Sequence, residues 1–248
     1  MARLDRVLVL GATSAIAQEC VRAFAAAGAK LYLVGRDAEK LASIRADARV
    51  RGAECVETRA LDLSEFGCHA ELIAGAMARW NGLDAALIAH GVLPDQKECE
   101  ADPGALLHAF DTNCLSVLSL ATLLAAHFER QGSGVLAVIS SVAGDRGRAS
   151  NYAYGAAKAG VTCFLQGLRS RLAKAGVTVL TIKPGLVDTP MTAALPKNPL
   201  YASPQRVGKR IYRAMIAAER VVYVPWFWRW IMLAVRLIPE SVFMKVKL

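Results

Sequence analysis

The sequence predicts an α/β fold: one doubly wound domain whose seven-stranded, mostly parallel sheet has helices on both faces. Two observations lead to this prediction. Short apolar runs alternate along the 248 residues with longer segments of helical periodicity, which is the order of βαβ units. The apolar runs are also continuous in Val, Leu and Ile, as strands covered on both faces should be.

The elements are expected in strict alternation. Strands are expected over 6–10, 30–35, 54–59, 83–89, 134–140, 177–183 and 221–224. Helices are expected over 14–27, 37–50, 64–80, 103–130, 152–175 and 203–218. The composition changes after residue 221, where Trp and basic residues gather. We therefore expect a main domain over 1–225 and a Trp-rich, basic, amphipathic extension over 226–248.

The first strand runs into a turn of small residues that opens the first helix. A helix N-terminus presents free N–H groups and the positive end of the helix dipole, and small residues let a phosphate reach the backbone. A pyrophosphate site is expected there, although Ala15 adds a methyl group that would crowd the phosphate. The residues expected to bind it are Gly11, Thr13, Ser14, Ala15 and Ile16.

The end of the second strand indicates which dinucleotide is bound. Gly35 has no carboxylate for the ribose 2′-hydroxyl of NAD, whereas Arg36 offers a planar donor fork for the 2′-phosphate of NADP. Asp37 is placed to cap the next helix. We expect NADP(H) to be preferred over NAD(H), with Asp62 and Leu63 lining the adenine end. The alternative is that Arg36 is a solvated loop residue.

Tyr154 and Lys158 are four residues apart, so they share one face of the helix expected over 152–175. A phenol beside an ammonium is suited to proton transfer, because the positive charge favours the phenolate. Ser141, thirteen residues before the tyrosine, can hold the oxygen that is protonated. Tyr152 should face away from Tyr154 and serve packing or line the substrate.

Taken together, several motifs resemble the short-chain dehydrogenase/reductase family over residues 4–225 or so. The matching pieces are the Gly11–Ala17 turn, Asp62, Asn113, Ser140-Ser141, Tyr154-x-x-x-Lys158 and Pro184-Gly185-Leu186-Val187-Asp188-Thr189-Pro190. The resemblance implies a Rossmann-type catalytic domain over 1–225 and an NAD(P)-dependent enzyme that acts on CH–OH groups. It also implies a homodimer or homotetramer.

The resemblance further implies a role for each matching residue. Tyr154 is the general acid/base, Lys158 lowers the pKa of the tyrosine and binds the nicotinamide ribose, and Ser141 hydrogen-bonds the substrate oxygen. Asn113 holds the water of a proton relay that runs through Lys158. The nicotinamide pocket is expected to involve Pro184, Gly185, Val187 and Thr189.

After the fourth strand the chain departs from the family pattern. The family usually shows Asn-Asn-Ala-Gly, whereas this sequence reads Ile88-Ala89-His90-Gly91. His90 and Gly91 are expected near the nicotinamide ribose. His90 is either a satisfied structural histidine, which we favour, or a ribose ligand.

Three of the four tryptophans lie in the segment 225–239. At helical period an apolar side is formed by Trp226, Trp230, Ile231, Ala234, Leu237 and Ile238, with Arg229 and Arg236 on another side and Lys245 and Lys247 beyond. Such a segment can lie on a membrane surface, cover the substrate pocket or form a subunit contact, and we leave the three open. All fit an apolar substrate, as does the apolar loop 188–203.

A weaker similarity points to reductases that act on polyprenyl-phosphate-linked keto-sugars. It rests on the Gly-Ala-Thr-Ser start, the Ala-His-Gly turn and the Trp-rich basic end. It implies a lipid-linked carbonyl substrate. The alternative is an ordinary small alcohol or ketone, with the C-terminal segment used only for assembly.

Composition and residue spacing bear on the remaining questions of partners, metal sites, disulfides and location. The net charge is +9, yet no dense basic run or nucleic-acid motif is visible, so no nucleic-acid partner is expected. The four histidines lack metal-ligand spacing, and the six scattered cysteines indicate reduced thiols. With no room for a leader before the first strand and no uncharged apolar run of about 18 residues, we expect a cytoplasmic protein, with possible peripheral membrane contact. A non-catalytic dinucleotide-sensing or scaffold protein is the alternative, which the set Asn113, Ser141, Tyr154 and Lys158 argues against.

Overall fold

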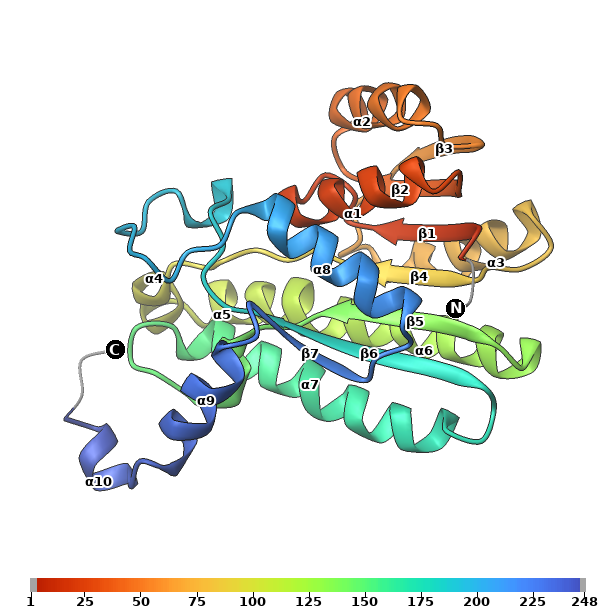
Figure 1. Ribbon diagram of the computed structural model, residues 1–248. Coiled ribbons are helices and arrows are strands. Elements are labelled where there is room, and N and C mark those ends of the chain that lie inside the picture. The colour runs from red at the N-terminus through yellow and green to blue at the C-terminus, as the bar shows by residue number, and fades with distance from the viewer. Residues whose placement is uncertain (1–3, 246–248) are drawn as a thin grey trace.

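The computed structural model describes residues 4–245, and its centre is one seven-stranded sheet (Figure 1). The strand order is β3-β2-β1-β4-β5-β6-β7, and every neighbouring pair is parallel. The bounds are β1 Arg6–Leu10, β2 Lys30–Gly35, β3 Cys55–Ala60, β4 Ala85–Ile88, β5 Gly134–Ile139, β6 Val177–Pro184 and β7 Val221–Val224. The predicted doubly wound fold is confirmed, and the order reverses between β1 and β4, which is where such folds bind ligands.

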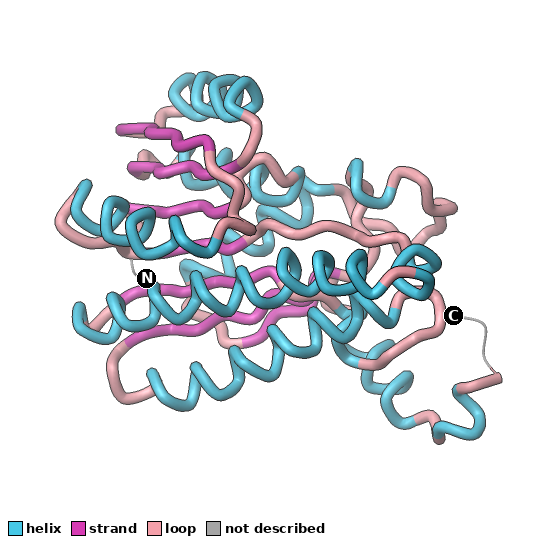
Figure 2. The backbone as a smooth tube through the Cα atoms, turned by 180° about the vertical axis from the view of Figure 1, so that it is seen from behind, coloured by secondary structure: helices cyan, strands magenta, loops and turns pink. Residues whose placement is uncertain are grey.

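Two helical layers cover the sheet, one on each face (Figure 2). One layer contains α1 Ala15–Ala26, α2 Ala38–Val50 and α8 Pro204–Ile216. The other contains α3 His69–Arg79, α6 Ser116–Gln131 and α7 Tyr152–Leu172. Alternate residues of β1 feed the two cores: Val7 and Val9 pack in the first, Leu8 and Leu10 in the second. Burial on both faces explains why the strands read as unbroken apolar runs.

The helix predicted over 103–130 has three parts. They are α5 Pro103–Phe110, a π-helical turn η2 Asp111–Leu115, and α6. The sequence did not predict α4 Gln96–Ala101, which precedes α5. The run Pro103–Gln131 has the length and hydropathy of a membrane span, but 56% of its most apolar window is buried inside the protein. Since α5 and α6 pack on α7, this burial is that of a core helix.

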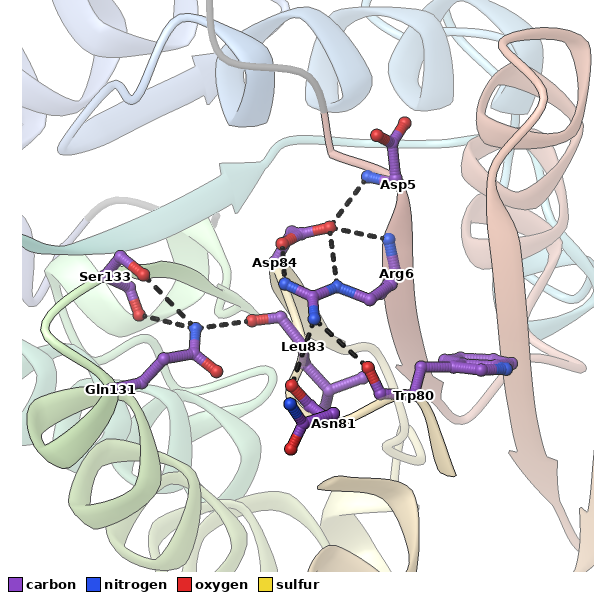
Figure 3. Close-up of polar contacts among 8 residues, drawn as sticks. All are labelled: Asp5, Arg6, Trp80, Asn81, Leu83, Asp84, Gln131 and Ser133. Carbon is purple, nitrogen blue, oxygen red and sulfur yellow. Dashed lines mark hydrogen bonds and ion pairs between the residues drawn. The ribbon is translucent and has the colours of Figure 1, made fainter. Parts of the chain in front are cut away.

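The amino ends of the central strands are held by one ion pair and its hydrogen bonds (Figure 3). The Asp84 carboxylate accepts bonds from the backbone N–H groups of Asp5 at 3.0 Å and Arg6 at 2.9 Å. It also pairs with the Arg6 guanidinium, whose Nη2 lies 2.6 Å from Oδ1. The remaining arginine nitrogen donates to the carbonyl oxygens of Trp80 and Asn81. This end of the sheet is a closed polar network.

The last part of the chain turns back over the carboxyl ends of the strands as α9 Trp228–Leu237 and α10 Glu240–Phe243 (Figure 1). Trp228 and Met232 are buried in a small cluster with Val142. The predicted apolar side divides, because Ile231 packs against that cluster while Trp226 and Trp230 are exposed. The extension therefore has an inner and an outer apolar face; its last three residues, with Lys247, lie outside the described part.

Candidate active site

Two adjoining cavities open at the carboxyl edge of the sheet, beside the point where the strand order reverses. The first has a volume of about 240 Å³ and the second about 190 Å³. Residues lining both are Ser14, Ile16, Ala89, His90, Gly91, Thr189 and Met191. Every residue that the sequence assigned to cofactor or catalysis lines one cavity or both, except Asn113.

The turn after β1 forms one wall of the first cavity. Gly11 has φ +82°, and a Cβ there would lie 2.5 Å from the backbone N of His90, so only glycine fits. Ser14 precedes α1 but makes no side-chain capping bond, which leaves the first N–H groups of the helix available. Ala15 lines the cavity. The turn thus has the helix end and the open backbone that a phosphate group needs.

Arg36 lies at the rim of the same cavity. Its side chain is 70% exposed, and its Nη1 lies 3.7 Å from Asp62 Oδ2. The Asp62 carboxylate accepts a bond from the backbone N–H of Ser64 at 2.8 Å, which lowers its pKa. Asp37 caps α2 by accepting from the N–H of Lys40 at 2.9 Å, as the sequence predicted. Arg36 is therefore held by one loose pairing and can turn toward a ligand.

His90 is a half-buried, neutral imidazole that lines both cavities. Burial, reinforced by the nearby Lys158 charge, lowers its pKa to about 3. The Ser116 hydroxyl donates to Leu63 O, so it accepts from His90 Nε2, which lies 2.9 Å away. The proton is thereby assigned to Nε2. The other nitrogen, Nδ1, is shielded from solvent and has no partner among the described residues, so His90 is only half satisfied by the protein.

Asn113 lies behind the site, on the π-helical turn η2, and lines neither cavity. Its Oδ1 accepts from the N–H of Val92 at 3.0 Å, and its Nδ2 donates to Ala109 O at 3.0 Å. A Cβ at Gly91 would lie 2.8 Å from that Oδ1. Both ends of the carboxamide are thus bonded to backbone, and Asn113 fixes the loop after β4 to the helix.

Ser141, Tyr154 and Lys158 come together on the second cavity. Lys158 Nζ lies 5.7 Å from the centre of the Tyr154 ring and donates to Ile139 O at 3.2 Å. Ser141 follows β5 and its Oγ accepts from the N–H of Ala143 at 3.0 Å. Ser140 is turned away, bonded to Lys158 O and to Thr162. The arrangement places a hydroxyl, a phenol and an ammonium on one wall.

Burial dominates the titration of this group. It raises the pKa of Tyr154 to about 12, although a hydrogen bond with Ser141 acts in the opposite direction. It lowers the pKa of Lys158 to about 8. Tyr154 is therefore a protonated phenol in the protein alone, which is the form that donates a proton.

The opposite wall is the segment after β6, where Pro184, Gly185, Val187 and Thr189 line the second cavity. The Gly185 N–H donates to Val224 O at 3.0 Å. A Cβ at Gly185 would lie 1.9 Å from Trp228 Nε1, so this glycine is needed for the indole to pack there. Trp228, from the C-terminal extension, thus forms part of the cavity wall.

The sequence did not single out three polar residues of this cavity: Arg148, Asn151 and Trp228. Each has a side-chain atom that is shielded from solvent and unpartnered within residues 4–245. Three charged residues, Asp145, Arg146 and Arg148, lie between Ser141 and Tyr154, so charge alone did not distinguish Arg148 in the sequence. Tyr152 is 45% exposed and lines a separate hollow beside α10, outside the second cavity.

Comparisons with known proteins agree on one family. A short chain dehydrogenase model matches residues 5–200. An uncharacterised oxidoreductase of Mycobacterium tuberculosis is 38% identical over 240 residues, covering 97% of this chain and 96% of the relative. One from Streptomyces coelicolor is 32% identical over 241 residues, covering 97% and 95%.

Solved structures show the same fold. A short-chain type dehydrogenase/reductase from Mycobacterium ulcerans superposes with a TM-score of 0.78 at 23% identity, covering 90% of this chain and 89% of that one. Levodione reductase superposes with a TM-score of 0.81 at 23% identity, covering 90% and 97%.

Proposed function

Because the chain belongs to the short-chain dehydrogenase family, whose oxidoreductases act on CH–OH groups with NAD(P), we propose that it interconverts a ketone and a secondary alcohol with NADP(H). The observation that carries the proposal is the meeting of Ser141, Tyr154 and Lys158 on a cavity that adjoins the small-residue turn. A proton donor beside a cavity that can hold a dinucleotide phosphate is what carbonyl reduction with NAD(P)H needs.

The residues of the first cavity fit a dinucleotide. The available N–H groups at the start of α1 suit its pyrophosphate, and the unpartnered Nδ1 of His90 can accept a bond from a ribose hydroxyl. Lys158, a residue that is only 2% exposed, can bind the nicotinamide ribose through its ammonium. When bound, the cofactor supplies the hydride.

The chain's own residues handle the proton. Ser141 donates a hydrogen bond to the carbonyl oxygen and holds it near the Tyr154 phenol. Tyr154 then gives its proton to that oxygen as negative charge develops on it. The Lys158 ammonium stabilises the phenolate that remains. Tyr154 is protonated in the protein alone, which is the form that acts as the acid when the ketone is reduced.

Two further proposals concern the choice of cofactor by Arg36 and the role of Asn113, which lies behind the site. Arg36 binds the 2′-phosphate, which makes NADP(H) preferred over NAD(H); its loose pairing with Asp62 leaves the guanidinium available. Asn113 acts by positioning the loop that carries His90 and Gly91, since its carboxamide is fully bonded to backbone.

The substrate side is proposed to be apolar, because the second cavity includes Leu93, Leu186, Met191, Leu195 and Trp228. In this proposal the main domain ends at residue 225. The extension from residue 226 covers the second cavity with its inner face, where Trp228 lies. Its outer face, with Trp226, Trp230 and two arginines, suits contact with an anionic membrane surface, where a lipid-linked ketone would be met. Assembly as a homodimer or homotetramer is proposed from the family.

A fluorescence titration tests the function first. Trp228 lines the second cavity, so cofactor binding should change tryptophan emission. We expect tight binding of NADPH, weaker binding of NADH, and oxidation of NADPH in the presence of apolar ketones. Absence of binding by either nucleotide would mean that the Ala15 methyl group blocks the pyrophosphate, and a scaffold role would replace the enzyme.

A further inference from the structure

Arg148 is a half-buried cation on the wall of the catalytic cavity. It lies in the loop between η3 Val142–Asp145 and α7, six residues before Tyr154. Its Nε is inaccessible to solvent and unpartnered in the described part of the chain. Burial lowers the pKa of its guanidinium, and no carboxylate among residues 4–245 offsets that effect. A partly buried guanidinium without a counter-charge carries a desolvation cost, which an anionic ligand would offset.

A second arginine in the same loop shows what a structural role looks like. Arg146 donates to Val235 O and Ile238 O at 2.6 Å each, pairs with Glu240 at 2.8 Å, and lies 3.8 Å from the centre of the Phe243 ring. Its bonds tie α9 and α10 to the domain. Arg148 makes no such bonds to the described residues, although it shares a hollow with Glu240, whose carboxylate is already paired with Arg146.

Two further polar groups on the cavity wall lack partners. The indole Nε1 of Trp228 is unpartnered, and that residue is only 7% exposed. The Oδ1 of Asn151 is unpartnered too. The residues between 4 and 245 that line this cavity include the cations Arg148 and Lys158 and no aspartate or glutamate. The cavity therefore offers a guanidinium fork and an indole donor, with one amide oxygen as an acceptor, in a positive, largely apolar setting.

We propose that Arg148, with the indole N–H of Trp228, binds an oxyanion of the substrate, so that the preferred substrate is a ketone carrying a carboxylate or a phosphate. A guanidinium fork matches both groups with two parallel hydrogen bonds. The inference deepens the proposed function and rests on it for the reaction. The anion is not the cofactor's pyrophosphate, because Arg148 lines the second cavity and not the one formed by the small-residue turn.

Direct binding tests the site without turnover. Benzoate, phenyl phosphate and the neutral control benzyl alcohol are titrated calorimetrically into the full chain, with and without NADP⁺. At least one anion should bind, benzyl alcohol should not, and Arg148→Met should weaken anion binding at least about tenfold. Arg148→Lys keeps the charge without the fork and should lie between. Arg213→Met removes an exposed charge on α8, outside the cavity, and should change nothing.

Turnover then identifies the source of the anion. Levulinate is compared with methyl levulinate, and dihydroxyacetone phosphate with dihydroxyacetone. The charged member of one pair should have the higher kcat/KM, and Arg148→Met should reduce the charged-to-neutral ratio about 30-fold. Thermal unfolding of each variant shows that it folds.

The outcomes separate the two proposals. Neutral ketones reduced as well as charged ones, with no anion binding, would overturn the oxyanion site and leave the reductase. Equal anion binding by wild type and Arg148→Met would also overturn the site. Anion binding that depends on Arg148, with NADPH oxidised by no ketone, would keep the site and overturn the reductase.

Discussion

The two ends of the sheet differ in whether their shielded polar atoms have hydrogen-bond partners. At the amino end, Arg6 and Asp84 bond each other and the surrounding backbone. Nearby, Gln131 Nε2 donates to Leu83 O at 2.8 Å (Figure 3). The carboxyl end holds four shielded atoms without partners, on His90, Arg148, Asn151 and Trp228. Within the described residues one other such atom exists, on Arg45 in α2.

The difference indicates that the amino end of the sheet serves stability and the carboxyl end serves ligand binding. Buried polar groups in folded proteins are normally bonded, so a cluster of unbonded ones needs a physical reason. At the amino end the network holds two parallel strands together and leaves nothing for a ligand. At the carboxyl end the protein leaves bonding capacity unused, which favours a ligand that supplies the missing partners.

The largest effect is expected at the carboxyl end. Tyr154→Phe removes the proton donor while keeping the ring, so kcat should fall about 10³-fold, the usual contribution of a general acid. Binding of NADPH and the unfolding temperature should hardly change. Steady-state kinetics with the fluorescence titration measures both. Turnover equal to that of the wild type would remove Tyr154 from the mechanism.

The mirror-image change is Asp84→Ala at the amino end. It leaves the Arg6 guanidinium and two backbone N–H groups without their acceptor, and we expect a loss of about 3 kcal/mol in the free energy of unfolding. Urea denaturation measures it, and kcat should stay within about twofold of wild type. Asp84→Asn, which keeps one acceptor oxygen, should lose less. A large fall in kcat with little loss of stability would contradict the assignment of the amino end to stability.

Lys158→Met should stabilise the protein while abolishing turnover. Burial lowers the lysine pKa from its ordinary value of 10.5 to about 8, so near neutral pH the folded protein holds an unfavourable charge. Removing it should gain about 1–2 kcal/mol after the lost bond to Ile139 O is counted.

The stability advantage of Lys158→Met over the wild type keeps its sign but decreases as the pH rises. Between the two pKa values the unfolded chain binds more protons, so wild-type stability rises with pH in that window. The variant's advantage should be complete below about pH 8 and shrink toward pH 10.5. Paired urea curves across this range measure it; a constant difference would contradict burial as the cause.

The smallest effect is expected at the rim, where Arg36 is mostly exposed. Arg36→Ala should raise the KM for NADPH about fivefold to tenfold and leave the KM for NADH nearly unchanged. Lys40→Ala is a matched control, because Lys40 is an exposed cation of α2 that does not line the cavity. Equal changes for both cofactors would exclude Arg36 from 2′-phosphate binding.

What the sequence could predict was local. Apolar runs gave the strands because both faces are buried, and Ser141, Tyr154 and Lys158 could be placed because helix periodicity and loop position fix them. The π-helical turn at Asn113 breaks that periodicity within a continuous helix, so the sequence alone did not predict it. Arg148 and Trp228 could not be assigned either, since their meeting depends on how a loop after β5 and a helix after β7 pack.

The position of Trp228 in the sequence determines when the wall of the catalytic cavity is completed during synthesis. The small-residue turn and the loop after β4, which form the nucleotide side, are made in the first half of the chain, whereas Trp228 comes near its end. A nascent chain that stops before β7 therefore has its phosphate turn but lacks one wall of the catalytic cavity. Proteins are made from the N-terminus onward, so the catalytic cavity gains its Trp228 wall only after β7 has been made.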